Sequence, residues 1–373
     1  MKSVPTKKIY IGAAFFAAAL AMPFSNSAFA QTAPEKGIVA FKYLNYEDSQ
    51  PDQERISVNT YSVSAMAPIA GKWSITTTYT NDSVSGASPE YHSHMVSGAS
   101  SIPENRQAVD LSITRYLPMG SVTLGSSYSA ENDYISHGYS AQASVDTEDK
   151  NMTFTFGGSY TTDTINPSND ESSYYDKRTI AGLFGITKVL TKRDIIQLNF
   201  GYSNGHGYFN DPYKLYEERP NKRESKTVMT RWNHHFEGTD GTSHLSYRYY
   251  TDSFGINAHT LGAEYVQPLP MEWTVTPSAR LYSQTAADFY LPDVPNPGQP
   301  PPTPPFSLDQ RLSAFGALTL GIKVEKRIAR DWLVDFKYEN YEQRAGWCIT
   351  GGGDAKLEPF SATFIQVGLS RQF

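Results

Sequence analysis

The sequence predicts an all-β protein: a single transmembrane antiparallel β-barrel of about sixteen strands, with short periplasmic turns and longer external loops. Three observations favour this fold class. Apolar and polar residues alternate along many segments, the connections between those segments alternate in length, and the chain ends on an alternating segment that closes with Phe373. No segment of comparable length has the period of an amphipathic helix.

The start of the chain indicates the compartment. Residues 1–30 have the pattern of a cleaved secretory signal peptide: three early lysines, the short apolar run "IYIGAAFFAAALAM", and small residues in "AFA" before the cleavage point. The apolar run is shorter than the roughly 20 residues of a spanning helix, which disfavours a membrane anchor. We therefore expect export through the Sec route and one mature domain, the barrel, over residues 31–373.

Charge and cysteine content exclude several classes of protein. The net charge is −6, and cleavage would remove three of the lysines, so nucleic acid is not an expected partner. A single cysteine, Cys348, excludes an intramolecular disulfide. The predicted location is the outer membrane of a Gram-negative bacterium. The predicted partners are outer-membrane lipid and the barrel-assembly machinery, and whether barrels associate into homo-oligomers stays open.

Period-2 alternation defines the strands. In "NMTFTFGGSY", Phe154 lies on the opposite face from Thr155, and in "IIQLNFGYS", Phe200 lies opposite Asn199. Many apolar faces begin or end with Trp or Tyr, as expected for aromatic girdles at the lipid interfaces. The segments are 36–47, 55–66, 72–83, 107–117, 120–131, 134–145, 150–162, 177–190, 193–203, 224–237, 242–252, 257–267, 272–285, 310–326, 331–343 and 360–373.

The connections separate by parity. After even-numbered segments they are short, such as "PM" and "TK". After odd-numbered segments several are long, namely 84–106, 163–176, 204–223, 286–309 and 344–359. Short periplasmic turns alternating with longer external loops are typical of an outer-membrane barrel, whereas a soluble sandwich gives no reason for this separation.

The last segment predicts an assembly signal. Ile365, Val367, Leu369 and Phe373 form an alternating apolar series at the end of the chain, which is similar to the C-terminal signal of bacterial outer-membrane proteins. Arg371 interrupts the series, but its long stem can carry the charge to the interface. This strand is expected to pair with the first strand and close the barrel.

The inward faces predict a charged lumen. Two interpretations remain open for them: a selectivity field for a solute, or an interior that is polar simply because it is wet. The predicted lumen-lining residues are Asp110, Arg248, Glu264, Arg280, Asp335, Lys337 and Glu339.

Catalytic and metal-binding patterns are weak. The sequence contains no nucleophile elbow, HExxH or Walker loop, so no catalytic residue, enzyme activity or cofactor is predicted. His92 and His94 are weak metal candidates, because a site needs three or four ligands and no further ligand has a recognisable spacing. The proline-rich stretch 291–306 could extend outward or fold over the mouth, and its role and that of Cys348 are left open.

Several stretches carry a resemblance that covers nearly the whole mature chain. They include "YEDSQPDQERISV", "SAENDYISHGYS", "GYFNDPYK", "YRYYTDSFGINAHTL" and "GLSRQF". With them the chain resembles an uncharacterised bacterial outer-membrane β-barrel family, a domain of unknown function family. The resemblance implies a barrel in the outer membrane and no known reaction. Some members are similar to proteins encoded near flavin-transfer and thioredoxin-like genes, which implies a link to an envelope redox system.

Three functional hypotheses follow. The first is a porin-like channel or plugged pore for an unidentified solute. The second is a barrel scaffold whose loops bind an envelope partner, which could belong to a redox system. The third is an outer-membrane enzyme with a site at the barrel rim. Single-channel conductance distinguishes the first hypothesis from the other two.

Overall fold

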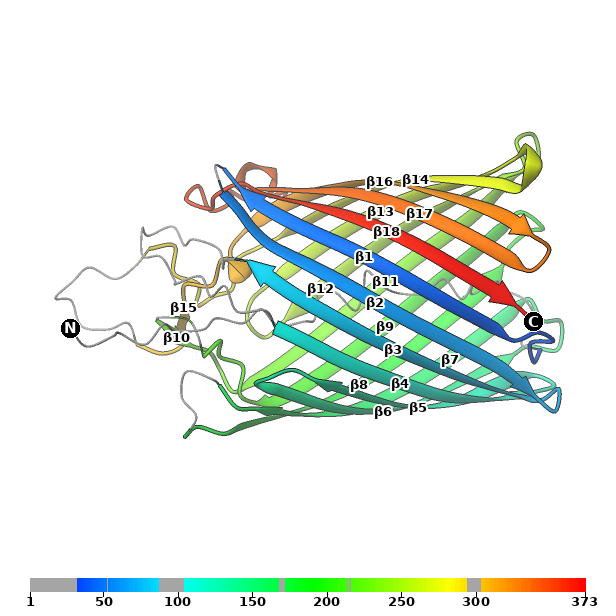
Figure 1. Cartoon of the computed structure of the whole chain (residues 1–373). Helices are drawn as coiled ribbons and strands as arrows, with labels where there is room; N and C mark the ends of the chain where they lie inside the picture. The colour runs from blue at the N-terminus through cyan, green and yellow to red at the C-terminus, as the bar shows by residue number, and fades with distance from the viewer. Residues whose placement is uncertain are drawn as a thin grey trace.

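The chain forms one closed antiparallel barrel of sixteen strands within its described residues (Figure 1). The computed structural model describes residues 32–51, 53–86, 104–167, 172–212, 214, 216–293 and 303–373. The predicted signal peptide, 1–30, and the candidate metal ligands His92 and His94 lie outside these residues. No helix among the described residues is long and apolar enough to cross a membrane.

The barrel strands have the following bounds: β1 (Ile38–Gln50), β2 (Gln53–Ile69), β3 (Trp73–Gly86), β4 (Glu104–Leu117), β5 (Gly120–Ala130), β6 (Tyr134–Asp146), β7 (Met152–Ile165), β8 (Tyr175–Val189), β9 (Asp194–Gly207), β11 (Lys222–Phe236), β12 (Gly241–Asp252), β13 (Asn257–Leu269), β14 (Trp273–Gln284), β16 (Phe315–Ala329), β17 (Trp332–Arg344) and β18 (Phe360–Gln372). Two further short strands, β10 (Glu217–Glu218) and β15 (Phe306–Ser307), pair with each other outside the barrel. Three 3-10 turns lie in the described connections, at Pro270–Glu272, Gln310–Leu312 and Ala345–Trp347.

The first and last strands close the barrel, as predicted. Ile38 lies opposite Gln372, and the pairing continues through Ser49 opposite Ser361. Beyond the ladder, the Gly37 N–H donates to the Phe373 carbonyl, and the Phe373 N–H donates to the Gly37 carbonyl, both at 3.0 Å. The two ends of the chain's barrel therefore meet at the same rim, which we call the turn end.

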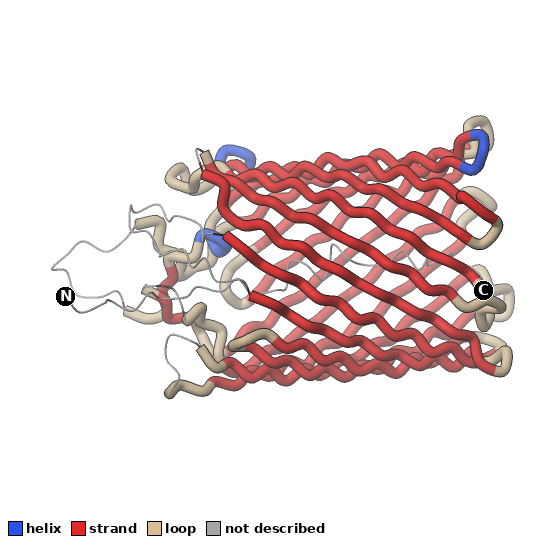
Figure 2. Tube along the Cα trace, in the orientation of Figure 1, coloured by secondary structure: helices blue, strands red, loops and turns tan. Residues whose placement is uncertain are grey.

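The two rims differ in the way the sequence predicts. Figure 2 shows tight turns at the turn end and larger connections at the opposite end, which we call the loop end. At the turn end, the turn after β2 places Ala70 and Gly71 at φ values of 50° and 62°. Left-handed residues at both central positions match the right-handed twist of a two-stranded ribbon. The long connections β9–β11, β14–β16 and β17–β18 all lie at the loop end.

Most strand boundaries agree with the predicted segments to within three residues, and the largest error has a local cause. The segment expected to begin at residue 310 begins as β16 at Phe315. Residues Gln310–Leu312 instead form a 3-10 turn, because the Asp309 side chain accepts a hydrogen bond from the Arg311 N–H and caps it. An N-cap of this kind competes locally with the extended strand conformation.

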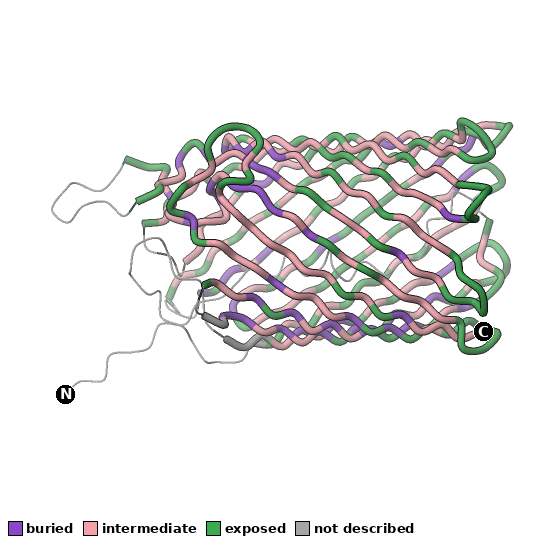
Figure 3. The backbone as a smooth tube through the Cα atoms, turned by 90° about the horizontal axis from the view of Figure 1, so that it is seen from above, coloured by how far each residue is buried: buried purple, intermediate pink, exposed green. Residues whose placement is uncertain are grey.

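The outer face of the barrel is a continuous apolar surface. The register places Phe156, Phe184 and Phe200 side by side on three strands, with ring centroids 5.3 Å and 6.3 Å apart. Figure 3 shows exposed positions interspersed with intermediate and buried ones along the strands. Arg371 also lies on this face, with its guanidinium 5.2 Å from the Trp332 ring centroid. The cation therefore stacks on an aromatic ring at the rim, which explains why the apolar series tolerates it.

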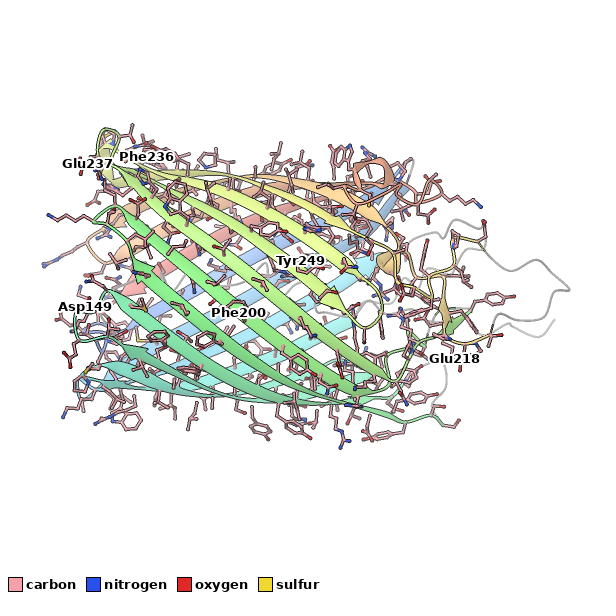
Figure 4. All side chains as sticks on the ribbon, turned by 180° about the vertical axis from the view of Figure 1, so that it is seen from behind. Asp149, Phe200, Glu218, Phe236, Glu237 and Tyr249 are labelled. Carbon is pink, nitrogen blue, oxygen red and sulfur yellow. The ribbon has the colours of Figure 1, made fainter. Side chains whose placement is uncertain are left out.

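The faces lead to a first prediction. Phe200 lies near the middle of the wall, far from Glu237 at the turn end and Glu218 at the loop end (Figure 4). We expect Phe200→Arg to reduce the free energy of unfolding of the bilayer-inserted barrel by about 2–4 kcal/mol, because it exposes a charge to lipid. The measurement is denaturant titration in lipid vesicles, read by heat-modifiable migration on gels.

The matched control changes only the face. Asn199→Arg puts the same charge one residue away on the inner side, where the Asn199 amide lies close to Gly185. We expect a clearly smaller loss there, and the same contrast between Phe154→Arg and Thr155→Arg on β7. Equal losses on the two faces would mean that the outer face does not contact lipid.

Candidate functional site

The barrel interior is the candidate site, and its wall carries charges of both signs. The register places the predicted residues Asp335, Lys337 and Glu339 in one column on β17, and Arg248, Glu264 and Arg280 on the neighbouring strands β12, β13 and β14. Asp110 is separated from both groups, on β4. All seven face away from the apolar outer surface. Whether they line a path for water and ions stays a prediction.

On the β17 side, carboxylates and lysines neutralise one another. Lys337 pairs with Glu339 at 2.8 Å, and Lys323 pairs with Glu325 at 3.0 Å on β16. In the next register row, Gly368 lies between Asp335 and the buried Lys42.

Gly368 is necessary for this row. A Cβ at this position would lie 2.0 Å from the Asp335 Oδ2. The absence of a side chain therefore lets Asp335 lean across the strand in the direction of Lys42, whose charge it helps to balance.

On the β11–β14 side, three arginines lack such partners. Arg280 Nη2 donates a hydrogen bond to Thr319 Oγ1 at 3.3 Å, and the Arg248 guanidinium lies 6.0 Å from the Tyr250 ring centroid. Arg231, on β11, faces the same interior. None of the three guanidinium groups forms an ion pair with a described carboxylate.

Arg231 and Arg280 border a cavity of about 250 Å³ in the wall. Its lining includes Arg231, Arg280, Glu264, His244 and Glu339. The sequence analysis did not predict Arg231 and His244 as interior residues. Arg231 could have been predicted, because its neighbour Trp232 belongs to the outer face and alternation then places Arg231 on the inner face.

Ion pairs also border the interior near the loop end. Each joins an inward carboxylate to a cation on the same or an adjacent strand. They are Asp48–Arg55 at 3.8 Å, Asp82–Arg106 at 2.5 Å, Asp163–Lys177 at 3.0 Å and Asp252–Arg223 at 2.5 Å. The charge of this rim is therefore mostly neutralised pair by pair, in contrast to the arginines deeper in the wall.

Two connections fold together beyond the loop end. We call the described parts of the β9–β11 and β14–β16 connections the loop cap (Figure 1). They join through the β10–β15 pair, in which Glu217 lies opposite Ser307. The Ser307 hydroxyl also donates to the Glu217 carboxylate. Sequence reasoning did not predict this sheet, because two-residue strands have no periodicity to detect.

Asp309 is the centre of the loop cap. Its side chain is fully buried and accepts from Arg219 Nη2 at 2.7 Å and Arg311 Nη2 at 2.5 Å, with Lys214 Nζ at 3.9 Å. Burial by itself would raise the pKa of Asp309, but the charges of Arg311, Lys214 and Arg219 outweigh it and hold the pKa well below its usual range. Burial lowers the pKa of Lys214 to about 8, against the attraction of Asp309.

An apolar cluster joins the loop cap to the β12–β13 connection of the barrel. Phe254, from the β12–β13 connection, packs with Ala287, Phe289 and Leu312 from the β14–β16 connection. The Tyr290 hydroxyl donates to Asp354 Oδ2 at 2.7 Å, which links the β17–β18 connection to the same structure. The described ends of the proline-rich stretch thus belong to the loop cap, while residues 294–302 lie outside the described part of the chain.

The histidines and the cysteine have structural contacts. The Tyr247 hydroxyl lies 2.7 Å from His259 Nδ1, a hydrogen bond between two neighbouring strands of the wall. His234 Nδ1 lies 2.7 Å from Asp194 Oδ1. Cys348 Sγ lies 3.4 Å from the Gln284 carbonyl oxygen at the rim. Within the described ranges, no three His, Cys, Asp or Glu side chains are grouped so that they could hold a metal ion.

A closed antiparallel barrel with an apolar outer face and a charged interior has the architecture of the outer-membrane β-barrel class. The chain belongs to the family described as "Protein of unknown function (DUF3570)", whose profile matches residues 12–364. The family resemblance carried by the sequence motifs is therefore confirmed. A search of the curated proteins gives no significant match.

Solved structures share the fold at low sequence identity. A bacterial polysaccharide outer membrane secretin superposes with a TM-score of 0.54 at 6% identity, over 90% of this chain and 98% of that chain. OccK1 from Pseudomonas aeruginosa gives a TM-score of 0.47 at 8% identity, over 91% and 98%. The siderophore receptor PirA from Pseudomonas aeruginosa gives 0.46 at 12% identity, over 84% of this chain and 57% of the receptor. The chain thus spans little more than half of that receptor, and these likenesses concern the fold alone.

Proposed function

We propose that the protein is an outer-membrane channel of the porin type, which passes a small polar solute along the inner wall of the barrel. In this proposal the turn end faces the periplasm and the loop cap lies outside the cell. No reaction and no cofactor are part of it. The chain reaches the outer membrane by Sec export and is inserted by the barrel-assembly machinery.

The observation that carries the proposal is the mixed-charge interior behind an apolar outer face. Charged groups buried in a dry core would each need a partner, because an uncompensated buried charge is costly. Arg231, Arg248 and Arg280 form no ion pair with a described carboxylate, yet all three lie on the inner face, and Arg231 and Arg280 line a cavity there. Unpaired guanidinium groups are expected where water or a polar solute can solvate them.

A scaffold that binds an envelope partner is the second candidate. It is favoured by the loop cap, whose buried ion cluster around Asp309 gives the projecting loops a defined shape. Loops held in one conformation lose little entropy when a partner binds them. The two candidates differ in whether the interior conducts.

The experiment is conductance of the purified, folded protein in a planar lipid bilayer under potassium chloride. We expect discrete single-channel steps, together with recovery of the protein in the outer-membrane fraction and heat-modifiable migration. Asp309→Asn serves as a second variant, because loosening the loop cap should increase conductance if the cap obstructs the mouth. Folded protein that gives no steps, with or without this substitution, would overturn the channel proposal and favour the scaffold.

A further inference from the structure

A notch in the inner wall lies between two arginines of one register row. Arg231 of β11 pairs with Ser246 of β12, Ser246 with Gly262 of β13, and Gly262 with Arg280 of β14. Three strand spacings separate the two arginines, roughly 14 Å between Cα atoms. The residues between them, Ser246 and Gly262, have a small side chain or none, so the inner surface between the two guanidinium groups is unfilled. We call this place the lumen notch.

The rows on either side complete the border. Arg248 lies one row nearer the loop end, opposite Met229 and Thr260. Glu264 and His244 lie opposite each other one row nearer the turn end. The inner surface of a barrel is concave, so these side chains point toward a common space; Glu264 and His244 line the cavity of about 250 Å³ there together with Arg231 and Arg280, and Arg248 lies one row beyond it.

The charges around the lumen notch do not cancel. Arg231, Arg248 and Arg280 keep their charge at any physiological pH, and none has an ion-pair partner among the described carboxylates. Glu264 is the only acid of the notch without a cation of its own, because Glu339 is held by Lys337 at 2.8 Å. Three cations facing one free carboxylate leave a local positive excess within a wall that is otherwise balanced.

We propose that the lumen notch binds a small organic polyanion, with two or more carboxylate or phosphate groups on the arginines and a hydroxyl group donated to Glu264. This inference rests on the proposed channel function and names its solute class. Guanidinium groups bind planar oxyanions through paired hydrogen bonds, which explains the use of arginine rather than lysine here. The volume equals roughly eight water molecules, so the solute is small.

The site is suited to passage rather than storage. Its arginines are held by few contacts: Arg280 by one 3.3 Å hydrogen bond to Thr319, and Arg248 by a loose stacking on Tyr250. An anion held by groups with so few other contacts is attracted into the lumen but can leave it, as conduction requires.

The experiment measures block of the potassium chloride current by citrate, tricarballylate and pyrophosphate. Citrate and tricarballylate differ only in one hydroxyl group, and pyrophosphate distinguishes phosphate from carboxylate binding. We expect citrate to block at a lower concentration than tricarballylate. In Glu264→Gln the two should block at the same concentration. Arg231→Ser with Arg280→Ser should raise the half-blocking concentration by about tenfold or more, because each charged hydrogen bond is lost.

Two further variants distinguish binding in the lumen notch from a general effect of the protein's charge. Gly262→Leu leaves the charge unchanged but fills the inner surface between the two guanidinium groups, where an added Cβ would lie 2.7 Å from the Ser246 Oγ. It should weaken the block as the arginine variant does. Arg178→Ser removes the same charge from β8, in the register row of Thr162 and His206 on the outer face, and should leave the block unchanged.

The lumen notch can be rejected independently of the channel proposal. Equal half-blocking concentrations in wild type, the arginine variant and Gly262→Leu would overturn the lumen notch while conductance stands. A loss of block in Arg178→Ser equal to that in the arginine variant would also overturn it. If wild type does not conduct, citrate titration calorimetry on the folded, detergent-solubilised barrel tests the notch, and an unchanged heat in the arginine variant would reject it.

Discussion

Deletion of Phe373 is expected to abolish most insertion of the barrel, and Phe373→Ser to reduce it sharply. The last residue forms two backbone hydrogen bonds with Gly37 at 3.0 Å, one in each direction, at the point where the sheet closes. Its ring also covers Gly37, where a Cβ would lie 2.5 Å from the ring. Deletion leaves these backbone groups unpaired at the edge of the bilayer, at a cost of several kcal/mol each.

Cell fractionation with heat-modifiable migration measures this effect. We expect the deletion variant to be degraded before insertion, and Phe373→Ser to show an intermediate level because its backbone pairing is kept. Arg371→Leu is the matched control two residues earlier, on the same outer face beside Trp332. It should insert at least as well as wild type. Wild-type membrane levels of the deletion variant would show that the closing strand does not depend on its last residue.

The barrel could be predicted from the sequence because its constraint is local and repeated. In a strand such as β7, Phe154 can face lipid only if its neighbour Thr155 faces the interior. Period-2 alternation alone therefore predicts where a strand lies, which of its residues face outward, and roughly how long it is. Closure between β1 and β18 could be expected because an open edge would leave unpaired backbone groups in lipid. The start of β16 was missed because the Asp309 cap acts against the alternation.

The candidate site was predictable only in part. Alternation assigned Arg248, Glu264 and Arg280 to the interior one strand at a time, but it cannot place them relative to one another. Their proximity depends on the register of β12, β13 and β14, which is set by the whole sheet. The loop cap could not be predicted from the sequence for another reason. Its pairs join residues about ninety positions apart, such as Arg219 and Asp309, in connections without any periodic pattern.

Asp309→Asn should open the loop cap while the barrel stays folded. The carboxylate is fully buried among Lys214, Arg219 and Arg311, and its loss removes the one acceptor that all three cations share. Arg219 then keeps its ion pair with Glu217, and Arg311 keeps its pair with Asp211 at 2.8 Å. Removing one partner of a buried ion pair destabilises by about 3–5 kcal/mol when the other charge is left uncompensated, and with Glu217 and Asp211 still in place we expect the lower end of that range, about 3 kcal/mol. This loss should appear as undocking of the two connections and not as unfolding of β9, β11, β14 or β16.

Trypsin reports this undocking directly, because it cleaves after Lys214 and Arg311 beside Asp309, although not after Arg219, which Pro220 follows. On intact proteoliposomes we expect cleavage of Asp309→Asn to be faster than that of wild type by about a hundredfold or more. Asp293→Asn is the control: the same substitution in an exposed loop pair with Lys356, which should change little because exposed pairs contribute little. Cleavage at the wild-type rate in Asp309→Asn would mean that the apolar cluster around Phe254 holds the cap alone.

The pH dependence of the loop cap follows from the same residue. Because the pKa of Asp309 is depressed in the folded cap, its contribution to docking is complete above the unfolded-state pKa of about 3.9. The contribution is lost as the pH falls below that value, when the undocked state binds a proton that the docked state does not. We therefore expect wild type to keep its resistance to trypsin from neutral pH down to about pH 5. A cap that opened already near pH 6 would require a titrating group other than Asp309.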